Sequence, residues 1–250
     1  AKLQTIPGTS IDPKAFYDIV TKPPDSLVAA YPWLKDPKIR PAGATLEGFL
    51  YPATYKVRID PLKPTDAMGL VRMMLDEFVQ QVGTDRMKVP KERGMTFQQV
   101  LTLASIVERE AALDEERPLI AGVYENRLDP KKWTTRLLQS DPTVFYVNDT
   151  LQLEAMPFGQ WKTYVFWAAL TGQLPATLPP AVAGYNTYTH RGLPPGPICT
   201  PTADSIDAAL NPDTKTGYLF FLALPDGSGK SVFARTQAEH ERNVAKYGTN

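Results

Sequence analysis

Apolar residues recur at helical spacing in several stretches of the chain. The run TDAMGLVRMMLDEFVQQVG predicts a helix that Thr65 caps and Gly83 ends. In TFQQVLTLASIVEREAA, Thr96 and Gln99 have the spacing of a capping box, which predicts a second helix that begins there. A third helix is expected to start near Pro118 and to carry LIAGVYENRL.

The two ends of the chain differ in regularity. Up to about Gly43, one short helix is expected over residues 12–21, and the rest shows no regular pattern. Near the other end, YLFFLAL and SVFA flank PDGSGK, which predicts a β-hairpin. A last helix is expected with Thr236 as its cap and Glu239 completing a capping box. The predicted class is therefore α+β, a mainly helical domain with a small antiparallel β-sheet.

The segment between Pro142 and Tyr185 is less regular and contains the aromatic stretch WKTYVFWAAL. This stretch fits a helix whose rings pack on the body of the domain, and it also fits an exposed apolar patch used for binding. Of the two interpretations, we favour packing against the core.

One carboxylate interrupts the apolar face of the second predicted helix. With residues placed about 100° apart, this face spans roughly 160°. It is formed by Phe97, Val100, Leu101, Leu103, Ala104, Val107 and Ala111. Glu108 lies inside the face, Arg109 points away from it, and Glu110 lies near its other edge. The two glutamates are therefore not equivalent.

A glutamate among apolar neighbours must find a partner or keep its proton, because burying its charge is costly. One interpretation of Glu108 is a buried ion pair, with Arg127 or Arg136 as the partner. The other is a general acid that stays protonated near neutral pH and donates to a leaving oxygen. Periodicity leaves both interpretations open.

Composition narrows the classes of partner. Lys plus Arg equals Asp plus Glu at 27 each, so charge gives no reason to expect nucleic acid and fits a neutral or uncharged polymer. One cysteine excludes an internal disulfide, and with only two histidines we expect no metal site. No stretch reaches the roughly 18 apolar residues of a membrane span. The chain begins with Ala, so this says little about an anchor in a longer protein.

Three motifs combine aromatic rings with hydrogen-bonding side chains. They are LEGFLYPATY at residues 46–55, LQSDPTVFY at 138–146 and YNTYTHRGLPPGPICTP at 185–201. Sugar rings offer hydroxyl groups at their edges and apolar faces for stacking, so this combination is typical of a carbohydrate-binding cleft. Each motif alone would also fit an ordinary turn.

Together with LASIVEREAALDEERPLIAGVYENRL and the closing YLFFLALPDGSGKSVFARTQAEHERNVAKY, these motifs resemble the endolytic murein transglycosylase (YceG-like) family. The match covers about residues 46–247. Members of that family are bacterial inner-membrane proteins with one N-terminal anchor, an extracytoplasmic LysM-like module and a catalytic domain. The resemblance implies a catalytic domain at 46–250, a lead-in segment at 1–45 with at most a remnant of the LysM-like module, and an anchor that is absent from this chain.

The resemblance also implies a reaction. Glu108 occupies the position of the family's catalytic glutamate in its ASIVE-[KR]-E motif. It would cleave the β-1,4 bond between N-acetylmuramic acid and N-acetylglucosamine without water and leave a 1,6-anhydromuramyl end. No cofactor is implied. The substrate would be nascent peptidoglycan strands, and peptidoglycan synthases are candidate partners.

Further site residues follow from the same motif positions. The cleft is expected to be lined by Gln139, Ser140, Asp141, Tyr185, Asn186, Thr187 and Tyr188, with Glu47 and Tyr51 on its outer wall. Glu110 is expected to support the fold or the electrostatics of the site. The stretch 148–184 is longer than the family pattern leads us to expect.

The sequence is also compatible with two other functions. A hydrolytic muramidase on the same scaffold would release a reducing end in place of the anhydro end. A glycan-binding or scaffold module of the wall-synthesis machinery would not need Glu108.

Overall fold

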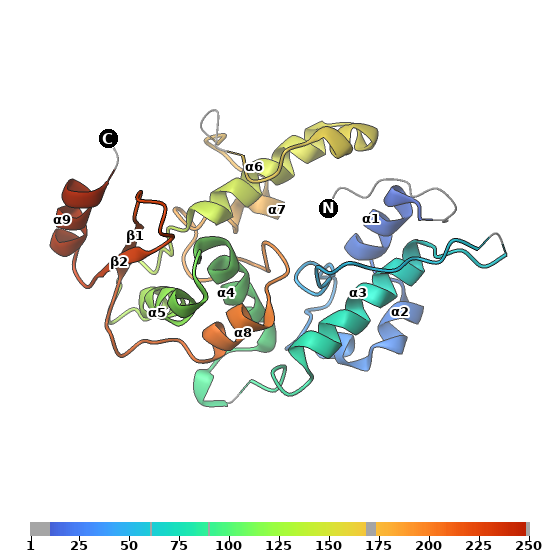
Figure 1. The fold of residues 1–250 in the computed structure, drawn as a ribbon, viewed down its shortest axis with the longest axis horizontal. Coiled ribbons are helices and arrows are strands. Elements are labelled where there is room, and N and C mark those ends of the chain that lie inside the picture. The colour runs from blue at the N-terminus through green and yellow to red at the C-terminus, as the bar shows by residue number, and fades with distance from the viewer. Residues whose placement is uncertain (1–10, 61, 90, 169–173, 249–250) are drawn as a thin grey trace.

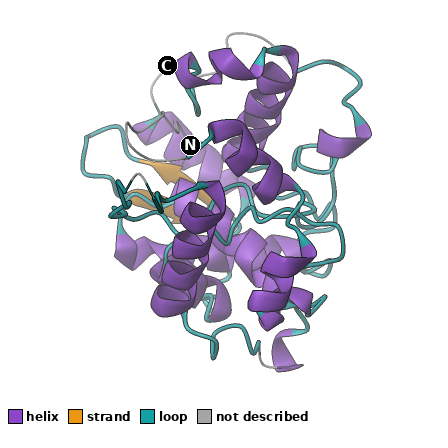
Figure 2. Cartoon of the chain, turned by 90° about the vertical axis from the view of Figure 1, so that its right-hand side faces the viewer, coloured by secondary structure: helices purple, strands orange, loops and turns teal. Residues whose placement is uncertain are grey.

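The computed structural model describes residues 11–248 except 61, 90 and 169–173. Helices make up most of its regular secondary structure, and two short strands form a small sheet (Figure 2). The α-helices are α1 Pro13–Thr21, α2 Asp25–Ala30, α3 Ala67–Val82, α4 Phe97–Glu110, α5 Arg117–Leu128, α6 Asp141–Ala155, α7 Pro180–Ala183, α8 Ala203–Leu210 and α9 Gln237–Tyr247. Short 3-10 helices are η1 Pro32–Lys35, η2 Lys91–Arg93, η3 Asp114–Glu116 and η4 Phe158–Thr163, and the strands are β1 Phe220–Ala223 and β2 Ser231–Ala234. The predicted α+β class is confirmed.

Helix α4 lies at the centre of the molecule and packs against α8, α5 and α6 (Figure 1). Every residue from Val100 to Val107 is buried, as is Phe97 at its start. The predicted capping box is present, because Thr96 and Gln99 each accept a hydrogen bond from the other's backbone N–H. This helix therefore forms the fixed frame from which its last residues project.

The segment before α3 is more regular than predicted. Helix α1 begins after Asp12 as expected, but the sequence pattern missed α2 and η1. Both are very short, and short elements give too few turns for periodicity to register. Leu27, Leu34 and Ile39 are buried in the same apolar cluster as α3 and α4. The boundary at residue 45 stays a prediction.

Helix α3 is capped by a different residue from the one predicted. Asp66 precedes the helix, and its Oδ1 accepts a hydrogen bond from the Gly69 N–H at 2.7 Å. Thr65 instead accepts one from the N–H of Arg58. Gly83 ends the helix as predicted, with φ of 75°, in the left-handed region that glycine adopts without strain.

The segment after residue 140 differs most from the prediction. Helix α6 starts at Asp141, so most of the LQSDPTVFY motif is helical. The aromatic stretch 161–170 is not a single helix: η4 ends at Thr163, a turn follows, and residues 169 and 170 lie outside the described residues. Trp161 contacts Tyr17 of α1 with ring centroids 4.9 Å apart, whereas the Val165 side chain is 64% exposed. This stretch therefore combines packing with exposure.

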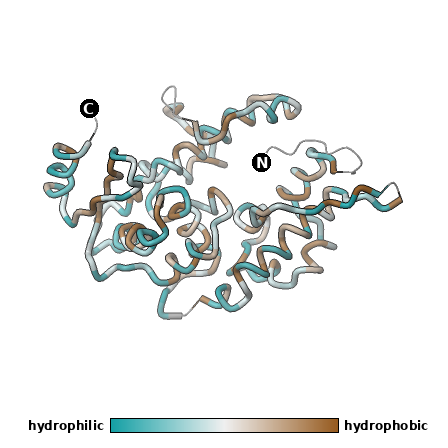
Figure 3. Tube along the Cα trace, in the orientation of Figure 1, coloured by the Kyte–Doolittle hydropathy of each residue, from teal (hydrophilic) through white to brown (hydrophobic). Residues whose placement is uncertain are grey.

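The hairpin and the last helix match the prediction. Strands β1 and β2 pair antiparallel, with Phe220 opposite Ala234 and Ala223 opposite Ser231. The capping box of Thr236 and Glu239 starts α9. Helix α9 buries none of its residues and is mainly hydrophilic (Figure 3), so it covers the hairpin from the solvent side.

Candidate active site

Residues 195–202, which we call the strap, run beside α4 in the same direction as the helix. At one end the Gln98 side chain donates to the Pro195 carbonyl at 2.7 Å. Further along, the Ile198 N–H donates to Ser105 Oγ at 3.0 Å. At the other end Thr202 reaches Glu108. The strap thus brings a distant part of the sequence to the end of α4.

Gly48 brings the first predicted motif against the strap. Its φ is 89°, and a Cβ there would lie 2.6 Å from Cγ of Pro197 and 3.0 Å from a methyl group of Leu101. Only glycine permits both this conformation and this approach. Glu47 and Tyr51, on either side of Gly48, are therefore carried by a loop that is fixed to the strap and to α4.

The carboxylate of Glu108 is bound through one of its two oxygens. Oε2 accepts hydrogen bonds from the Thr202 N–H at 3.1 Å, the Thr202 hydroxyl at 2.7 Å, the Ser205 hydroxyl at 2.7 Å and the Arg117 guanidinium at 3.2 Å. Oε1 accepts none from the described residues. The ionic partner is therefore Arg117, and the predicted partners Arg127 and Arg136 are wrong. An i, i+9 pair between two helices cannot be read from one helical wheel.

This donor set changes the expected protonation of Glu108. Burial raises the pKa of Glu108, but the hydrogen bonds from Ser205 and Thr202 and the charge of Arg117 together bring that pKa below its ordinary value. The Glu108 side chain also keeps 21% of its surface exposed. The carboxyl of Glu108 therefore favours its charged form more than an ordinary glutamate does, and its role as a general acid stays a prediction.

Glu110 has the opposite environment. Its Oε1 accepts hydrogen bonds from the Tyr124 hydroxyl at 2.6 Å and the Ser140 hydroxyl at 2.7 Å. Burial nevertheless raises the pKa of Glu110 above its ordinary value, against the effect of these two bonds. Glu110 links α4 to α5 and to the start of α6.

Two of the predicted motifs meet in space. The Ser140 N–H donates to Thr187 Oγ1 at 3.0 Å, and the Gln139 N–H donates to the Thr187 carbonyl at 3.1 Å. The Tyr188 hydroxyl donates to Asp141 at 2.5 Å at the exposed rim. Ser140 and Thr187 are fully buried, so they hold the two motifs together and leave Gln139, Asp141 and Tyr188 facing outward.

A third group of predicted residues surrounds Cys199 of the strap. The charges of Glu47 and Glu108 both act on its thiol, whose pKa burial and these charges raise to about 12. Burial and the charge of Glu47 likewise raise the pKa of Tyr185 to about 12. Tyr185 packs on Tyr146, with ring centroids 4.8 Å apart. Glu47 and Tyr185 therefore share the neighbourhood of Glu108.

Tyr51 and Asn186 are the last two of the predicted site residues. Burial raises the pKa of Tyr51, and the charges of Asp204 and Glu108 raise it further, which puts the phenol within electrostatic range of Glu108. The Asn186 side chain accepts a hydrogen bond from the Tyr188 N–H at 3.1 Å and shapes the turn of its own motif.

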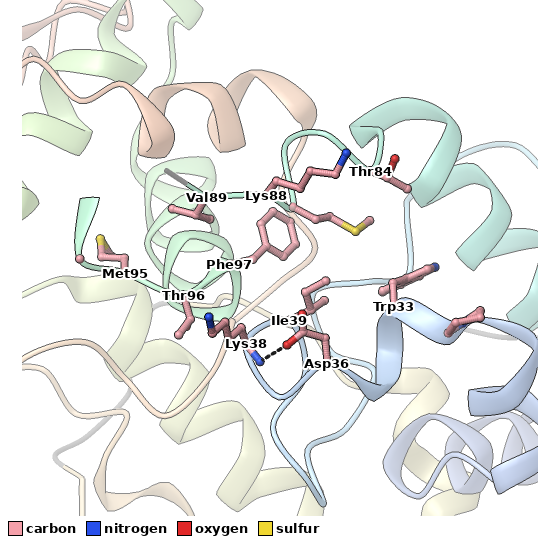
Figure 4. A pocket seen from close by; sticks show the side chains of 13 residues that line it. Trp33, Asp36, Lys38, Ile39, Thr84, Lys88, Val89, Met95, Thr96 and Phe97 are labelled. Carbon is pink, nitrogen blue, oxygen red and sulfur yellow. Dashed lines mark hydrogen bonds between the residues drawn. The ribbon is translucent and has the colours of Figure 1, made fainter. Parts of the chain in front are cut away.

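A cavity of about 700 Å³ lies elsewhere, at the other end of α4 (Figure 4). Its lining includes Trp33, Ile39, Met95 and Phe97. Phe97 begins α4, eleven residues before Glu108, which corresponds to about 16 Å along the axis. This cavity is therefore separate from the predicted site.

The described residues contain no cluster of His, Cys, Asp and Glu side chains able to hold a metal ion. Within the same residues, no helix has the length and apolar character needed to cross a membrane.

The sequence did not single out Arg117, Thr202, Ser205 or Tyr124 as parts of the site. Arg117 and Tyr124 lay in a quoted motif without an assigned role, and Thr202 and Ser205 lie one and four residues after the motif at 185–201. Thr202 precedes α8 in the position of an N-cap, which is the one local signal that could have drawn notice to it.

Fold and site together define a mainly helical α+β protein whose central helix ends in a half-buried carboxylate held by a strap. The chain matches the YceG-like family over residues 9–246 and belongs to it.

Curated relatives carry the name endolytic murein transglycosylase. One from Bacillus subtilis is 36% identical over 202 residues, which is 81% of this chain and 48% of the relative. One from Streptococcus pneumoniae is 33% identical over 223 residues, 88% of this chain and 36% of the relative. The chain thus spans half or less of the length of these relatives. A crystal structure of a YceG-like protein from Listeria monocytogenes superposes with a TM-score of 0.65 at 30% identity, covering 92% of this chain and 66% of that one.

Proposed function

We propose that this chain is the catalytic part of an endolytic lytic transglycosylase that acts on peptidoglycan glycan strands. The observation that carries the proposal is Glu108, a carboxylate in the YceG-like ASIVERE motif with one oxygen free of donors from the described residues. The bond cleaved is the β-1,4 link between N-acetylmuramic acid and N-acetylglucosamine. The product is a 1,6-anhydromuramyl end, and the curated relatives' name supports this class of reaction.

Glu108 serves as both acid and base in this proposal. In its protonated form it gives a proton to the glycosidic oxygen as the bond from that oxygen to C1 breaks. The resulting carboxylate then takes the proton of the C6 hydroxyl while O6 bonds to C1. No water is consumed, and Glu108 ends in the protonated form in which it started the cycle. This differs from glycosidases that use a second carboxylate as nucleophile or as the base that activates water.

The other predicted residues would bind the glycan on either side of Glu108. Gln139, Asp141 and Tyr188 are exposed and offer hydrogen-bonding groups to sugar hydroxyl and acetamido groups. Ser140, Asn186 and Thr187 act mainly by holding these groups in place. Tyr185, Glu47 and Tyr51 form the wall on the Cys199 side.

We further propose that the domain works on the outer side of the bacterial inner membrane, held by an anchor outside this chain and close to peptidoglycan synthases. The resemblance of the motifs supports the anchor and the synthases, and the relatives' name supports the peptidoglycan substrate. Fractionation and crosslinking of the full-length protein in cells test both points. Recovery in the cytosol, without crosslinks to synthases, would contradict them.

The product test uses uncrosslinked glycan strands and mass spectrometry. Wild type is expected to give anhydro ends, and Glu108→Gln is expected to lose about 10²- to 10⁴-fold in rate because it removes the proton donor and acceptor. Glu115→Gln is the matched control, because Glu115 is exposed in η3 and lies outside the site. It should retain the wild-type rate.

The chemical end group of the cleaved glycan distinguishes the proposed function from its alternatives. Reducing ends in place of anhydro ends would assign a hydrolytic muramidase. Equal cleavage by wild type and by folded Glu108→Gln would overturn the role of Glu108. Glycan binding without cleavage by any variant would favour a binding module.

A further inference from the structure

The four hydrogen bonds on Oε2 of Glu108 come from three residues in two segments of the chain. Thr202 ends the strap, Ser205 lies in the first turn of α8, and Arg117 is the first residue of α5. The Arg117 guanidinium also donates to Ser205 Oγ at 2.5 Å and to Asp114 at 3.0 Å. Arg117 and Ser205 are therefore held in place by each other, and Asp114 holds Arg117 as well.

This arrangement favours a negative charge on one oxygen. Ser205 is fully buried, and the Arg117 side chain is only 12% exposed, so water competes little for these donors. The Thr202 N–H also lies at the N-terminus of α8, where the helix dipole favours an anion. Removal of one donor would leave the other groups in place and reduce the preference for the charged form.

We propose, on the basis of the proposed function, that Arg117, Thr202 and Ser205 are positioning residues. They hold Oε2 of Glu108 fixed and negatively charged and leave Oε1 as the oxygen that meets the glycan. Glu108 must then gain a proton before it can act as an acid. Cleavage should consequently rise as the pH falls, and the three donors set where this rise occurs.

Other ionisable groups face this carboxylate and must be considered. Near Glu108 these are Arg117 from α5, the Tyr51 phenol from the first motif and the Cys199 thiol from the strap. The charge of Asp204 also acts on Tyr51, and the charges of Glu47 and Arg109 act on Cys199. On the α6 side, Asp141 faces Glu110. Arg117 is the one whose charge acts directly on Glu108, and the pKa of Cys199, at about 12, lies well above the range of the experiment.

The test measures protonation and activity separately. Carbon-13 NMR follows the carboxyl carbon of Glu108, assigned by its loss in Glu108→Gln, across a pH series. The rate of anhydro-product formation is measured over the same series. The variants are Ser205→Ala and Thr202→Val, which each remove one hydroxyl donor, and Thr202→Ser, which keeps it.

Ser205→Ala and Thr202→Val are expected to move the Glu108 titration midpoint and the alkaline limb of the rate profile together to higher pH. Their maximal rates should fall by up to about 10²-fold, because the carboxylate is less well oriented. Thr202→Ser should keep the alkaline limb of the rate profile at its wild-type pH. A residue with only a structural role would lower the rate without moving the limb.

Asp207→Asn is the matched control. Asp207 lies on α8 two residues after Ser205 and binds Arg86 at 2.6 and 2.7 Å, away from Glu108. This variant tests general damage to α8. It should leave the Glu108 titration midpoint and the alkaline limb of the rate profile unchanged. Circular dichroism confirms that each variant is folded.

Two results would overturn the proposal. One is a Glu108 midpoint that stays at its wild-type value in both Ser205→Ala and Thr202→Val. The other is a rate limb that stays fixed although the midpoint moves, because Oε1 would then not be the proton donor. If the midpoint moves as expected but wild type forms no anhydro ends, the effect of the donors on charge stands and the proposed function fails.

Discussion

Glu108 and Glu110 are two residues apart on α4, and their surroundings give them opposite affinities for a proton. The pKa of Glu108 is lowered, because three hydrogen bonds from Thr202 and Ser205 and the charge of Arg117 outweigh burial. Burial raises the pKa of Glu110, and two hydroxyl donors do not outweigh it. The comparison shows that the number and charge of the donors decide the protonation state of a carboxylate, in addition to its depth in the fold.

The same comparison separates two kinds of role. Glu108 keeps a free oxygen and partial exposure, so it can exchange a proton with a ligand. Glu110 connects Tyr124 of α5 and Ser140 at the start of α6, so it works as a link between three helices. This agrees with the interpretation of Glu110 as a supporting residue.

The largest expected effect is on activity. Glu108→Gln should lose about 10²- to 10⁴-fold in cleavage rate. Glu110→Gln should keep most of the rate, because an amide oxygen can accept the hydrogen bonds from both hydroxyl groups as Oε1 of Glu110 does. Rates on glycan strands for the two variants, prepared in parallel, check this. An equal loss in both would remove the distinction between the two glutamates.

A smaller effect is expected on stability. Glu110→Ala leaves the hydroxyls of Tyr124 and Ser140 without their acceptor, at a cost of about 1–3 kcal/mol in the free energy of unfolding. Glu110→Gln serves as its control and should remain close to wild type. Urea unfolding followed by circular dichroism measures both. A stable Glu110→Ala would mean that the link between α4, α5 and α6 contributes little.

Glu108 and Glu110 should also contribute to the stability of the fold in opposite pH ranges. The folded pKa of Glu110 is raised, so its contribution is present in full below about pH 4, the pKa of an unfolded glutamate, and is lost as the pH rises through the folded value. The folded pKa of Glu108 is lowered, so its contribution is present above about pH 4 and is lost as the pH falls through the folded value.

Urea unfolding over a pH series tests these signs. Glu110→Gln should remove the loss of stability at rising pH, and Glu108→Gln should remove part of the loss at falling pH. If the two variants changed the profile in the same direction, the opposite assignment of the two carboxyls would be wrong.

The smallest effect is expected at the residue between them. The Arg109 guanidinium lies 4.1 Å from the ring centre of Trp167, and Arg109 is exposed. Arg109→Ala should reduce the free energy of unfolding by about 0.5–1 kcal/mol. The rate and its pH limb should stay as in wild type. A shift of the limb would show that Arg109 acts on Glu108 through its charge.

Local signals accounted for the parts of the fold that the sequence predicted well. The capping boxes at Thr96 and Thr236 and the turn residues of the hairpin each act over a few residues, and all three elements formed where expected. Helix α6 was missed because a proline in its first turn, Pro142, was taken as a loop signal although proline also suits that position.

The site was harder to predict than the fold, because its contacts join residues that are far apart in the chain. The helical wheel put Glu108 among apolar positions of α4, but a wheel says nothing of the residues that cover them. Its main donors, Thr202 and Ser205, are 94 and 97 positions away in the chain. The direction of the pKa shift depends on these donors, so it could not be predicted from the helix alone.

The length of the strap must match the rise of α4 along its axis. Between Pro195 and Thr202 the strap must advance as far as α4 does between Gln98 and Glu108, which is about 15 Å. An insertion or deletion of a single residue after Ile198 would shift Thr202 along the helix by about 3.3 Å and separate its hydroxyl from Oε2. The length of this segment, as much as its composition, therefore forms part of the site.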